Sequence, residues 1–407
     1  MKIKPRESSI APSGKLKTHL TGRMTRGTSA AAASNVWSSL RESALIVLGA
    51  ALLLCLVDAI LFRTPWYARF RDPNSSTGRL EEVIASELTR QSWGRTVLVL
   101  GDSVMGEGFS ARLANRSQPG PRYQFVNAAV PGSTARCWYY MLRDMERPLG
   151  RYAVVVIPVR YYDDRDISYD DPADWILDAH YLAGRLRLLD VPAFAESYRG
   201  AGPRFEAFRK TLLKGLTYQE DFQALIDDPE ARLKSVNYAR GDPGWHLYYY
   251  AGLNQSLAGL AVNWRERTVA FPPGLSDFDQ SDLRQSFFAQ LPPTSAAEHE
   301  YRLNWIGRIV DRYQHTNTRI VIIRPPITAL TRPDEPPPAA RSAVRELASR
   351  PGVTVLDEHA FDALEKPELF ADARHWNQEG AARFTAALVR LVAQSAQPAP
   401  TGETAGH

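Results

Sequence analysis

Three residues that could act together in nucleophilic catalysis stand at opposite ends of the chain. Ser103 ends the tripeptide G-D-S, which directly follows the apolar run Thr96–Leu100. Asp372 and His375 stand three residues apart in the tetrapeptide D-A-R-H near the C-terminus. A serine attacks an acyl carbon when a base takes its proton and a carboxylate orients that base. The residue types predict this chemistry, although each motif alone is also typical of an ordinary turn or helix start.

The elements around these residues must bring them together. Apolar runs predict strands, and helical periodicity between the runs predicts helices, so the chain alternates between the two. Such alternation is typical of an α/β fold, a three-layer parallel sheet with helices on both faces. Ligands of such sheets bind beyond the carboxyl ends of the strands, where Ser103, Gly132 and Arg160 fall. The predicted strands are 96–100, 123–127, 153–159, 319–324 and 353–356, and the predicted helices are 106–115, 134–146, 338–350 and 378–394.

Three sequence blocks resemble those of the SGNH/GDSL hydrolase superfamily. Residues 96–109, T-V-L-V-L-G-D-S-V-M-G-E-G-F, are similar to the first block of that family. Residues 372–380, D-A-R-H-W-N-Q-E-G, are similar to its last block, and Gly132 in N-A-A-V-P-G-S-T stands where the second block has its glycine. The resemblance covers residues 94–162 and 318–394. It implies an SGNH-type fold and a serine hydrolase or acyltransferase activity.

The resemblance also implies a role for each matching residue. Ser103 would be the nucleophile, His375 the base and Asp372 the carboxylate that orients it. The backbone N–H groups of Ser103 and Gly132 would donate to the oxyanion of the tetrahedral intermediate. No cofactor and no metal ion is expected.

One block departs from the family pattern. The third block usually reads G-x-N, with an asparagine that donates to the oxyanion, whereas this chain has Arg160 near that position. Arg160 could stabilise the oxyanion, bind an anionic substrate, or form a salt bridge with Asp163, Asp164 or Asp166. A literal G-x-N at residues 252–254 falls too late in the chain to replace the missing block.

The apolar run Ala44–Phe62 predicts one membrane-spanning helix. It holds nineteen residues with a single charged side chain, Asp58, close to its end. A buried core helix and a cleaved signal peptide are the alternatives, and the unbroken run with polar flanks and no A-x-A site disfavours both. Eight Lys or Arg residues precede the run, which favours a cytoplasmic N-terminus and a catalytic part outside the cytoplasm, periplasmic or extracellular.

Composition and charge then outline the domains. Residues 1–42 carry a net charge of about +6, so the rest of the chain carries about −2, which argues against a nucleic-acid surface. The predicted division is a disordered basic tail (1–42), a transmembrane helix (43–63), a linker with a helix at 79–91 (64–93), an α/β domain with an inserted cap-like region at about 165–300 (94–394), and a flexible C-terminal tail (395–407).

Other chemistry-bearing residues have simpler interpretations. The aromatic residues Trp245 and Tyr248–Tyr250 could stack on sugar rings or fill the core of the insertion. Cys55 lies in the apolar run and Cys137 in a predicted helix, so we expect no disulfide. Five further histidines of the predicted domain show no spacing with carboxylates or cysteines that is typical of a metal site. They are His180, His246, His299, His315 and His359.

The sequence therefore predicts a membrane-anchored enzyme that acts outside the cytoplasm on acyl esters of a cell-envelope glycan. Its layout resembles membrane-anchored proteins of polysaccharide O-acetylation or D-alanylation, so a multi-spanning membrane acyltransferase is an expected partner. One alternative is a plain carboxylesterase or lipase that acts on small or lipid esters. Another is a non-catalytic envelope protein that keeps the fold and binds glycan or the acyltransferase.

Overall fold

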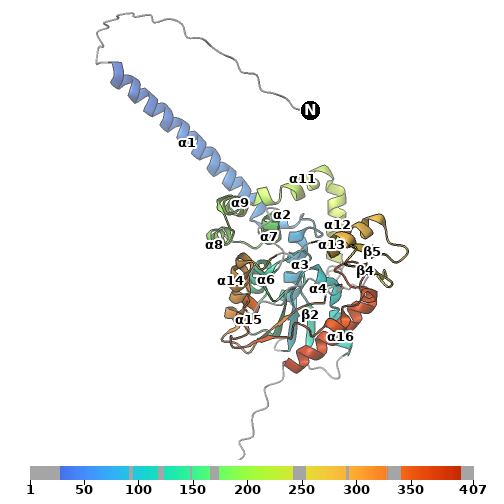
Figure 1. The fold of residues 1–407 in the computed structure, drawn as a ribbon. Coiled ribbons are helices and arrows are strands. Elements are labelled where there is room, and N and C mark those ends of the chain that lie inside the picture. The colour runs from blue at the N-terminus through green and yellow to red at the C-terminus, as the bar shows by residue number, and fades with distance from the viewer. Residues whose placement is uncertain are drawn as a thin grey trace, which may run out of the picture. The chain divides into compact units, whose positions relative to one another are not determined.

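The structure is a computed structural model that describes residues 28–90, 95–117, 123–146, 149–165, 174–241, 254–289, 293–326, 328 and 341–395. The chain forms two compact units, Met1–Val57 and Asp58–His407. Figure 1 shows that the second unit holds a sheet with helices against both of its faces.

One long helix, α1 (Thr28–Phe62), runs through the first unit and ends in the second. It contributes most of the segment Ser39–Ala68, which is long enough to cross a membrane and has a mean hydropathy of 2.8 in its apolar stretch. An apolar helix that ends at Phe62 is thus confirmed. Because α1 also covers residues 28–42, the prediction that this stretch lacks secondary structure is wrong; its four consecutive alanines are strong helix formers.

Five parallel strands form the central sheet, in the order β2-β1-β3-β6-β7. β1 (Thr96–Val99) lies between β2 (Gln124–Asn127) and β3 (Tyr152–Pro158). β6 (Arg319–Ile323) and β7 (Val353–Val355) complete the sheet beyond β3. The predicted parallel α/β sheet is confirmed, and every strand starts and ends within one residue of its predicted bounds.

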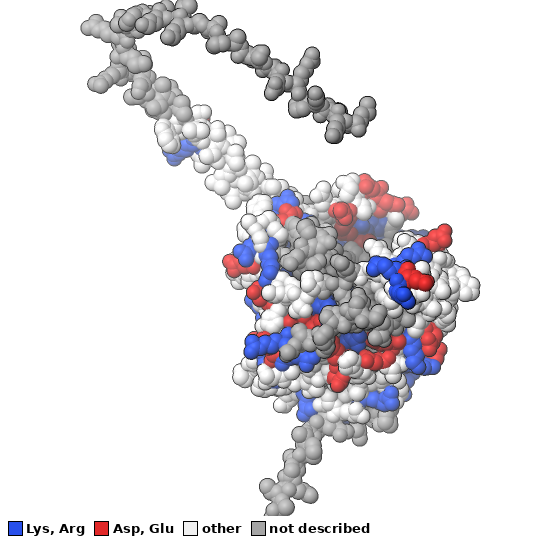
Figure 2. Space-filling view, viewed as in Figure 1, with Lys and Arg blue, Asp and Glu red and all other residues white. Residues whose placement is uncertain are grey.

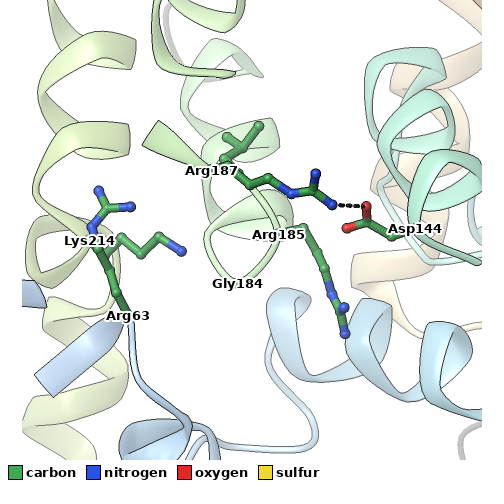
Figure 3. Close-up of a pocket in the computed structure, with 7 residues that line it drawn as sticks. Arg63, Asp144, Gly184, Arg185, Arg187 and Lys214 are labelled. Carbon is green, nitrogen blue, oxygen red and sulfur yellow. Dashed lines mark hydrogen bonds and ion pairs between the residues drawn. The ribbon is translucent and has the colours of Figure 1, made fainter. Parts of the chain in front are cut away.

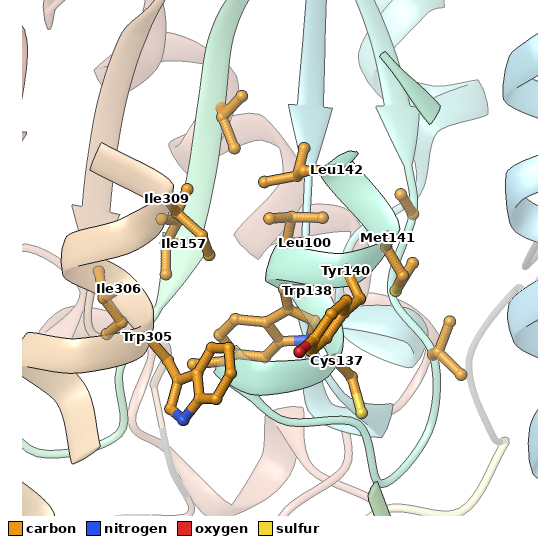
Figure 4. Packing of buried hydrophobic residues seen from close by; sticks show 14 of the residues in the cluster. Leu100, Cys137, Trp138, Tyr140, Met141, Leu142, Ile157, Trp305, Ile306 and Ile309 are labelled. Atoms are coloured by element: carbon orange, nitrogen blue, oxygen red, sulfur yellow. The ribbon is translucent and has the colours of Figure 1, made fainter. Parts of the chain in front are cut away.

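Side chains of the strands alternate between two cores, one on each face of the sheet. In β1, Leu98 belongs to the first core, whereas Val97 and Val99 belong to the second. Figure 4 shows the first core, to which α6 and α14 contribute Trp138 and Trp305. The first face is covered by α3 (Ser76–Thr89), α6 (Ala135–Met145), α14 (Ala296–Tyr313) and α15 (Ala343–Leu347), and the second by α4 (Ser103–Gly108), α5 (Ala111–Ser117) and α16 (Gln378–Ser395).

The long segment between β3 and β6 is mostly helical. Its first helices pack into the first core, where Tyr181 of α7 and Phe194 of α8 are buried. The aromatic residues Trp245 and Tyr248–Tyr250 lie outside the described residues. Before α14, the segment contains α7 (Asp174–Leu182), η1 (Leu188–Asp190), α8 (Val191–Glu196), α9 (Ala201–Leu212), α10 (Lys214–Thr217), α11 (Gln219–Asp227), α12 (Pro229–Gly241), the hairpin of β4 (Ala261–Asn263) and β5 (Thr268–Ala270), and α13 (Asp277–Phe288).

Candidate active site

The turn from β1 into α4 presents Ser103 at the carboxyl end of the sheet. Gly101 has a φ of +150°, and a Cβ at this position would come within 2.4 Å of the Met105 side chain, so only glycine fits. Asp102 caps α4, because its Oδ1 accepts a hydrogen bond of 2.9 Å from the Val104 N–H. Ser103 is therefore the first residue of a helix that begins directly beyond the strand.

The residues that flank the D-A-R-H segment hold it in place by a backbone hydrogen bond and by aromatic stacking. The Ala371 N–H donates to the His375 carbonyl at 2.9 Å, which closes the loop. Trp376 stacks between Phe370 and Phe384, with ring centroids 4.3 and 5.3 Å away, so its indole joins the loop to α16. A Cβ at Gly108 would come within 2.5 Å of that indole, so the α4 glycine lets the two segments approach.

This packing brings Ser103, His375 and Asp372 into one hydrogen-bonded chain. Ser103 Oγ lies 3.0 Å from His375 Nε2, and His375 Nδ1 lies 2.8 Å from Asp372 Oδ2. The other carboxylate oxygen of Asp372 accepts from the backbone N–H groups of Arg374 and His375, each at 2.7 Å. The carboxylate thereby favours the imidazole tautomer with its proton on Nδ1 and its lone pair on Nε2 facing the serine.

The electrostatic surroundings support a base at His375. Burial disfavours the charged imidazolium, but the hydrogen bond and charge of Asp372, followed by Glu107 and Asp102, outweigh burial and raise the pKa of His375 above 6.5. Burial also disfavours ionised Asp372, yet its hydrogen bonds from His375 and Arg374 lower the pKa of this carboxyl. Asp372 therefore stays ionised and stabilises the protonated, positively charged form of the His375 imidazole.

Two residues of this site had no role in the sequence prediction. Burial raises the pKa of Glu107, with the positive charge of His375 opposing and Asp372 reinforcing the rise. Glu107 stands four residues after Ser103 in α4, a spacing that places both on one face of a helix and could have indicated their proximity. Thr328, whose hydroxyl donates to the Asp372 carbonyl at 2.9 Å, gives no such signal.

The loop that contains Gly132 is tied to the strand end before the serine. The Val130 N–H and the Ser133 hydroxyl both donate to the Gly101 carbonyl, at 2.9 and 3.0 Å. Gly132 is exposed, with a φ of +72°. Within the described part of the chain, the N–H groups of Ser103 and Gly132 have no hydrogen-bond acceptor, so both remain able to donate to an oxyanion.

Arg160 lies two residues beyond β3, at the same edge of the sheet as Ser103. It is half-buried and forms no ion pair with any residue that the structure describes. Asp163 pairs with Arg165, which follows two residues later in the same turn. Asp164 pairs with Arg302 of α14, which packs against this turn. Of the three roles left open for Arg160, the salt bridge is thus not formed with Asp163 or Asp164, and residue 166 lies outside the described residues.

Other residues considered in the sequence have partners of their own or lie outside the described residues. His299 contacts Asp164 and His359 contacts Asp362, each at 2.8 Å, and His246 and residues 252 and 253 of the literal G-x-N lie outside the described residues. No three His, Cys, Asp or Glu side chains cluster as metal ligands in the described ranges. Cys137 is buried and its thiol donates to Asp178 at 3.2 Å; burial and this carboxylate raise the pKa of the thiol.

No known protein-family model matches this chain, and no curated protein sequence does. The chemistry assigned to the site therefore depends on its own residues and geometry.

Proposed function

We propose that this chain is a membrane-anchored serine esterase or O-acyltransferase of the SGNH type that acts on acyl esters of a cell-envelope glycan outside the cytoplasm. The observation that carries the proposal is the hydrogen-bonded chain from Ser103 through His375 to Asp372 at the carboxyl edge of a parallel sheet. The choice of a glycan as substrate depends on the resemblance of the sequence motifs and on the apolar helix α1.

The first half of the reaction forms an acyl-enzyme. Ser103 Oγ attacks the acyl carbon of the ester while His375 Nε2 takes the hydroxyl proton. The negative charge that develops on the carbonyl oxygen is stabilised by the backbone N–H groups of Ser103 and Gly132. When the tetrahedral intermediate collapses, the alcohol leaves with the proton from His375, and the acyl group stays on the serine.

Arg160 supports the oxyanion in place of the asparagine that the family uses. Its guanidinium has no ion-pair partner in the described part of the chain, so it is available for a developing negative charge. The acyl-enzyme is then resolved by a second hydroxyl, from water in an esterase or from a sugar in an acyltransferase. His375 deprotonates that hydroxyl in either case.

The full-length chain with Ser103→Ala tests the proposal. We expect the wild-type protein in neutral detergent to hydrolyse a short activated ester and to react with a fluorophosphonate probe. The variant should lose the labelling and several orders of magnitude in turnover. Ser349→Ala, which removes an exposed hydroxyl in the turn after α15, is the matched control and should behave as wild type.

The alternatives give different results. A plain carboxylesterase or lipase would hydrolyse small esters at a rate that added glycan does not change, and it would transfer no acyl group to the glycan. A non-catalytic protein of this fold would neither hydrolyse the ester nor react with the probe. Hydrolysis that persists in Ser103→Ala would exclude this serine as the nucleophile.

A further inference from the structure

A cavity unrelated to the Ser103 site lies where the chain leaves α1. Its volume is about 410 Å³, and it is formed by the segment after α1, by the end of α6, by the loop between α7 and η1, and by the start of α10. It is lined by Arg63, Asp144, Gly184, Arg185, Leu186, Arg187 and Lys214, none of which takes part in the Ser103 site.

The last turn of α1 is hydrogen-bonded to the segment that contains the cavity residue Lys214. Asp58 accepts hydrogen bonds from the N–H groups of Lys214 and Gly215, at 3.1 and 2.6 Å. The Arg63 guanidinium donates to the carbonyls of Thr211 and Leu212, at 2.9 and 2.6 Å. All of these residues belong to the unit Asp58–His407. The cavity thus directly adjoins the end of the apolar helix.

The lining is cationic. Figure 2 shows basic and acidic side chains interspersed over the face in view, whereas the cavity has four cationic side chains and one carboxylate. Arg187 lies 3.4 Å from Asp144, and Arg185 pairs with Glu81. The Lys214 ammonium has no hydrogen-bond or ion-pair partner within the described residues, although the residue is only 5% exposed. In Figure 3 this ammonium points into the space between the arginines.

A buried ammonium surrounded by other cations lowers the stability of the folded protein unless an anion balances its charge. Burial and the positive charges of Arg63, Arg71 and Arg185 lower the pKa of Lys214 to about 8, although the negative charge of Asp58 opposes this shift. Buried charges are normally paired, because desolvation disfavours an isolated one. An anion in the cavity would offset both the desolvation and the mutual repulsion of these cations.

Exposed apolar side chains stand close in the sequence to the residues that line the cavity. Leu188 and Leu189, which follow Arg187, are 58% and 92% exposed. Phe205 of α9, the helix that ends shortly before Lys214, is 66% exposed. Exposed apolar side chains beside basic residues are typical of surfaces that lie in the headgroup region of a bilayer. Arg63 of the cavity belongs to the segment Ser39–Ala68, which is apolar and long enough to cross one.

We propose that this cavity binds a phosphate group, with the Lys214 ammonium as its central contact and Arg63 and Arg187 around it. The phosphate belongs either to the headgroup of an anionic phospholipid or to a soluble phosphate compound. The binding is independent of the Ser103 chemistry. The membrane span bears only on which of the two sources supplies the phosphate.

Thermal unfolding of the full-length chain in neutral detergent tests the proposal. Inorganic phosphate is compared with chloride at equal ionic strength, and phosphatidylglycerol with phosphatidylcholine in mixed micelles. We expect a saturating phosphate ligand to raise the Tm by about 2–4 °C, since a ligand that binds only the folded state stabilises it. Lys214→Met should lose this rise, whereas Lys234→Met, which removes an exposed ammonium of α12, should keep it.

The outcomes separate the two sources and the failure of the proposal. A rise with inorganic phosphate identifies a soluble anion site, and a rise with phosphatidylglycerol alone identifies a lipid headgroup site. No rise with either ligand, or an equal rise in Lys214→Met, overturns the proposal. Arg187→Gln, at an exposed position, serves as a second variant should Lys214→Met not fold; it should weaken binding several-fold, and undiminished binding would contradict the proposal.

Discussion

The chain contains two histidine–aspartate pairs with the same hydrogen-bond length. His375 Nδ1 lies 2.8 Å from Asp372, and His359 Nδ1 lies 2.8 Å from Asp362, and the partners stand three positions apart in both pairs. The second pair is exposed, and no serine of the described residues hydrogen-bonds to its imidazole. The hydrogen bond to Ser103 therefore distinguishes the first pair, and the second pair provides a matched control.

Asp372→Asn should lower turnover on an activated ester by about 10⁴-fold, the usual effect of losing the carboxylate that fixes the histidine tautomer. The pH profile should change as well. Only neutral His375 accepts the serine proton, so wild-type activity rises with pH through the raised pKa of this histidine. Without the carboxylate that pKa falls, and the midpoint of the remaining activity should move to lower pH.

Asp362→Asn is the control for this experiment, because it breaks the same hydrogen bond at the exposed pair. It should change neither turnover nor the midpoint. Rate against pH, measured on the three full-length proteins, provides both quantities. An unshifted midpoint in Asp372→Asn would show that this carboxylate does not set the pKa of the base.

Arg160→Ala tests the departure from the family pattern. If the guanidinium donates to the oxyanion, turnover should fall by about 10²–10³-fold with little change in KM, because the interaction strengthens in the transition state. The Tm should stay near the wild-type value, since no ion pair of Arg160 within the described residues is lost. Arg160→Asn should restore part of the turnover.

Turnover, KM and Tm measured on the same Arg160 variants separate the remaining roles. A raised KM for anionic substrates with unchanged turnover on neutral esters would assign Arg160 to substrate binding. A lowered Tm with normal turnover per folded molecule would assign it a structural role.

The sequence predicted that Ser103 and His375 lie close together but not the partners of Asp164. Motif order and the carboxyl edge of a parallel sheet together restrict where Ser103 and His375 can lie. The partners of Asp164 come instead from distant helices, α14 and α15. Nothing in the local sequence identifies such partners.

At the scale of elements, Asp164 joins three parts of the chain after β3. It has a φ of +58°, a conformation that Asp and Asn tolerate better than most residues. Its carboxylate lies 3.1 Å from the Arg302 guanidinium and 2.8 Å from His299 Nδ1, both in α14. It also accepts from the Ala343 N–H at the start of α15, at 2.8 Å. The exit of β3 is thereby fixed against both helices.

Asp164→Asn keeps the shape of the side chain and the positive φ but removes a negative charge beside the buried guanidinium of Arg302. We expect it to destabilise the second unit by about 3 kcal/mol, because a buried charge that loses its partner is costly. Asp311→Asn, at an exposed ion pair with Arg350, should cost less than about 1 kcal/mol. Urea unfolding of both full-length variants in detergent measures the difference. Equal, small losses would show that the Asp164 contacts contribute little to stability.

Element boundaries show where local sequence was sufficient. The five strands of the central sheet were predicted within one residue, since buried parallel strands appear as short apolar runs, whereas the exposed hairpin of β4 and β5 was not predicted. The single helix predicted at 106–115 is instead α4 and α5, separated at Phe109 and Ser110. Gly106 and Gly108 weaken the helix before this break, and Ser110 then accepts from the Leu113 N–H at 3.3 Å, which starts the next one.

At the scale of the whole molecule, the segment inserted after β3 contributes to the main core. Tyr181 of α7 is buried there and donates a hydrogen bond to the Pro131 carbonyl, next to Gly132. Asp178 of the same helix accepts from the Thr134 hydroxyl at 2.9 Å. The sequence predicted the length of this segment but not this role, because helical periodicity shows that a face is apolar and does not show what covers it.

The orientation of the whole chain in the membrane follows, we propose, from the basic residues before α1. Residues 1–42 contain eight Lys or Arg, so the N-terminus should stay in the cytoplasm and the unit Asp58–His407 should lie outside. A reporter that is active only outside the cytoplasm should be active when fused after residue 407 and silent when fused after residue 40. Deleting residues 2–38 removes seven of the eight charges and should lower the active fraction of the first fusion. The opposite pattern in the two fusions would place Ser103 in the cytoplasm and remove envelope glycans from its possible substrates.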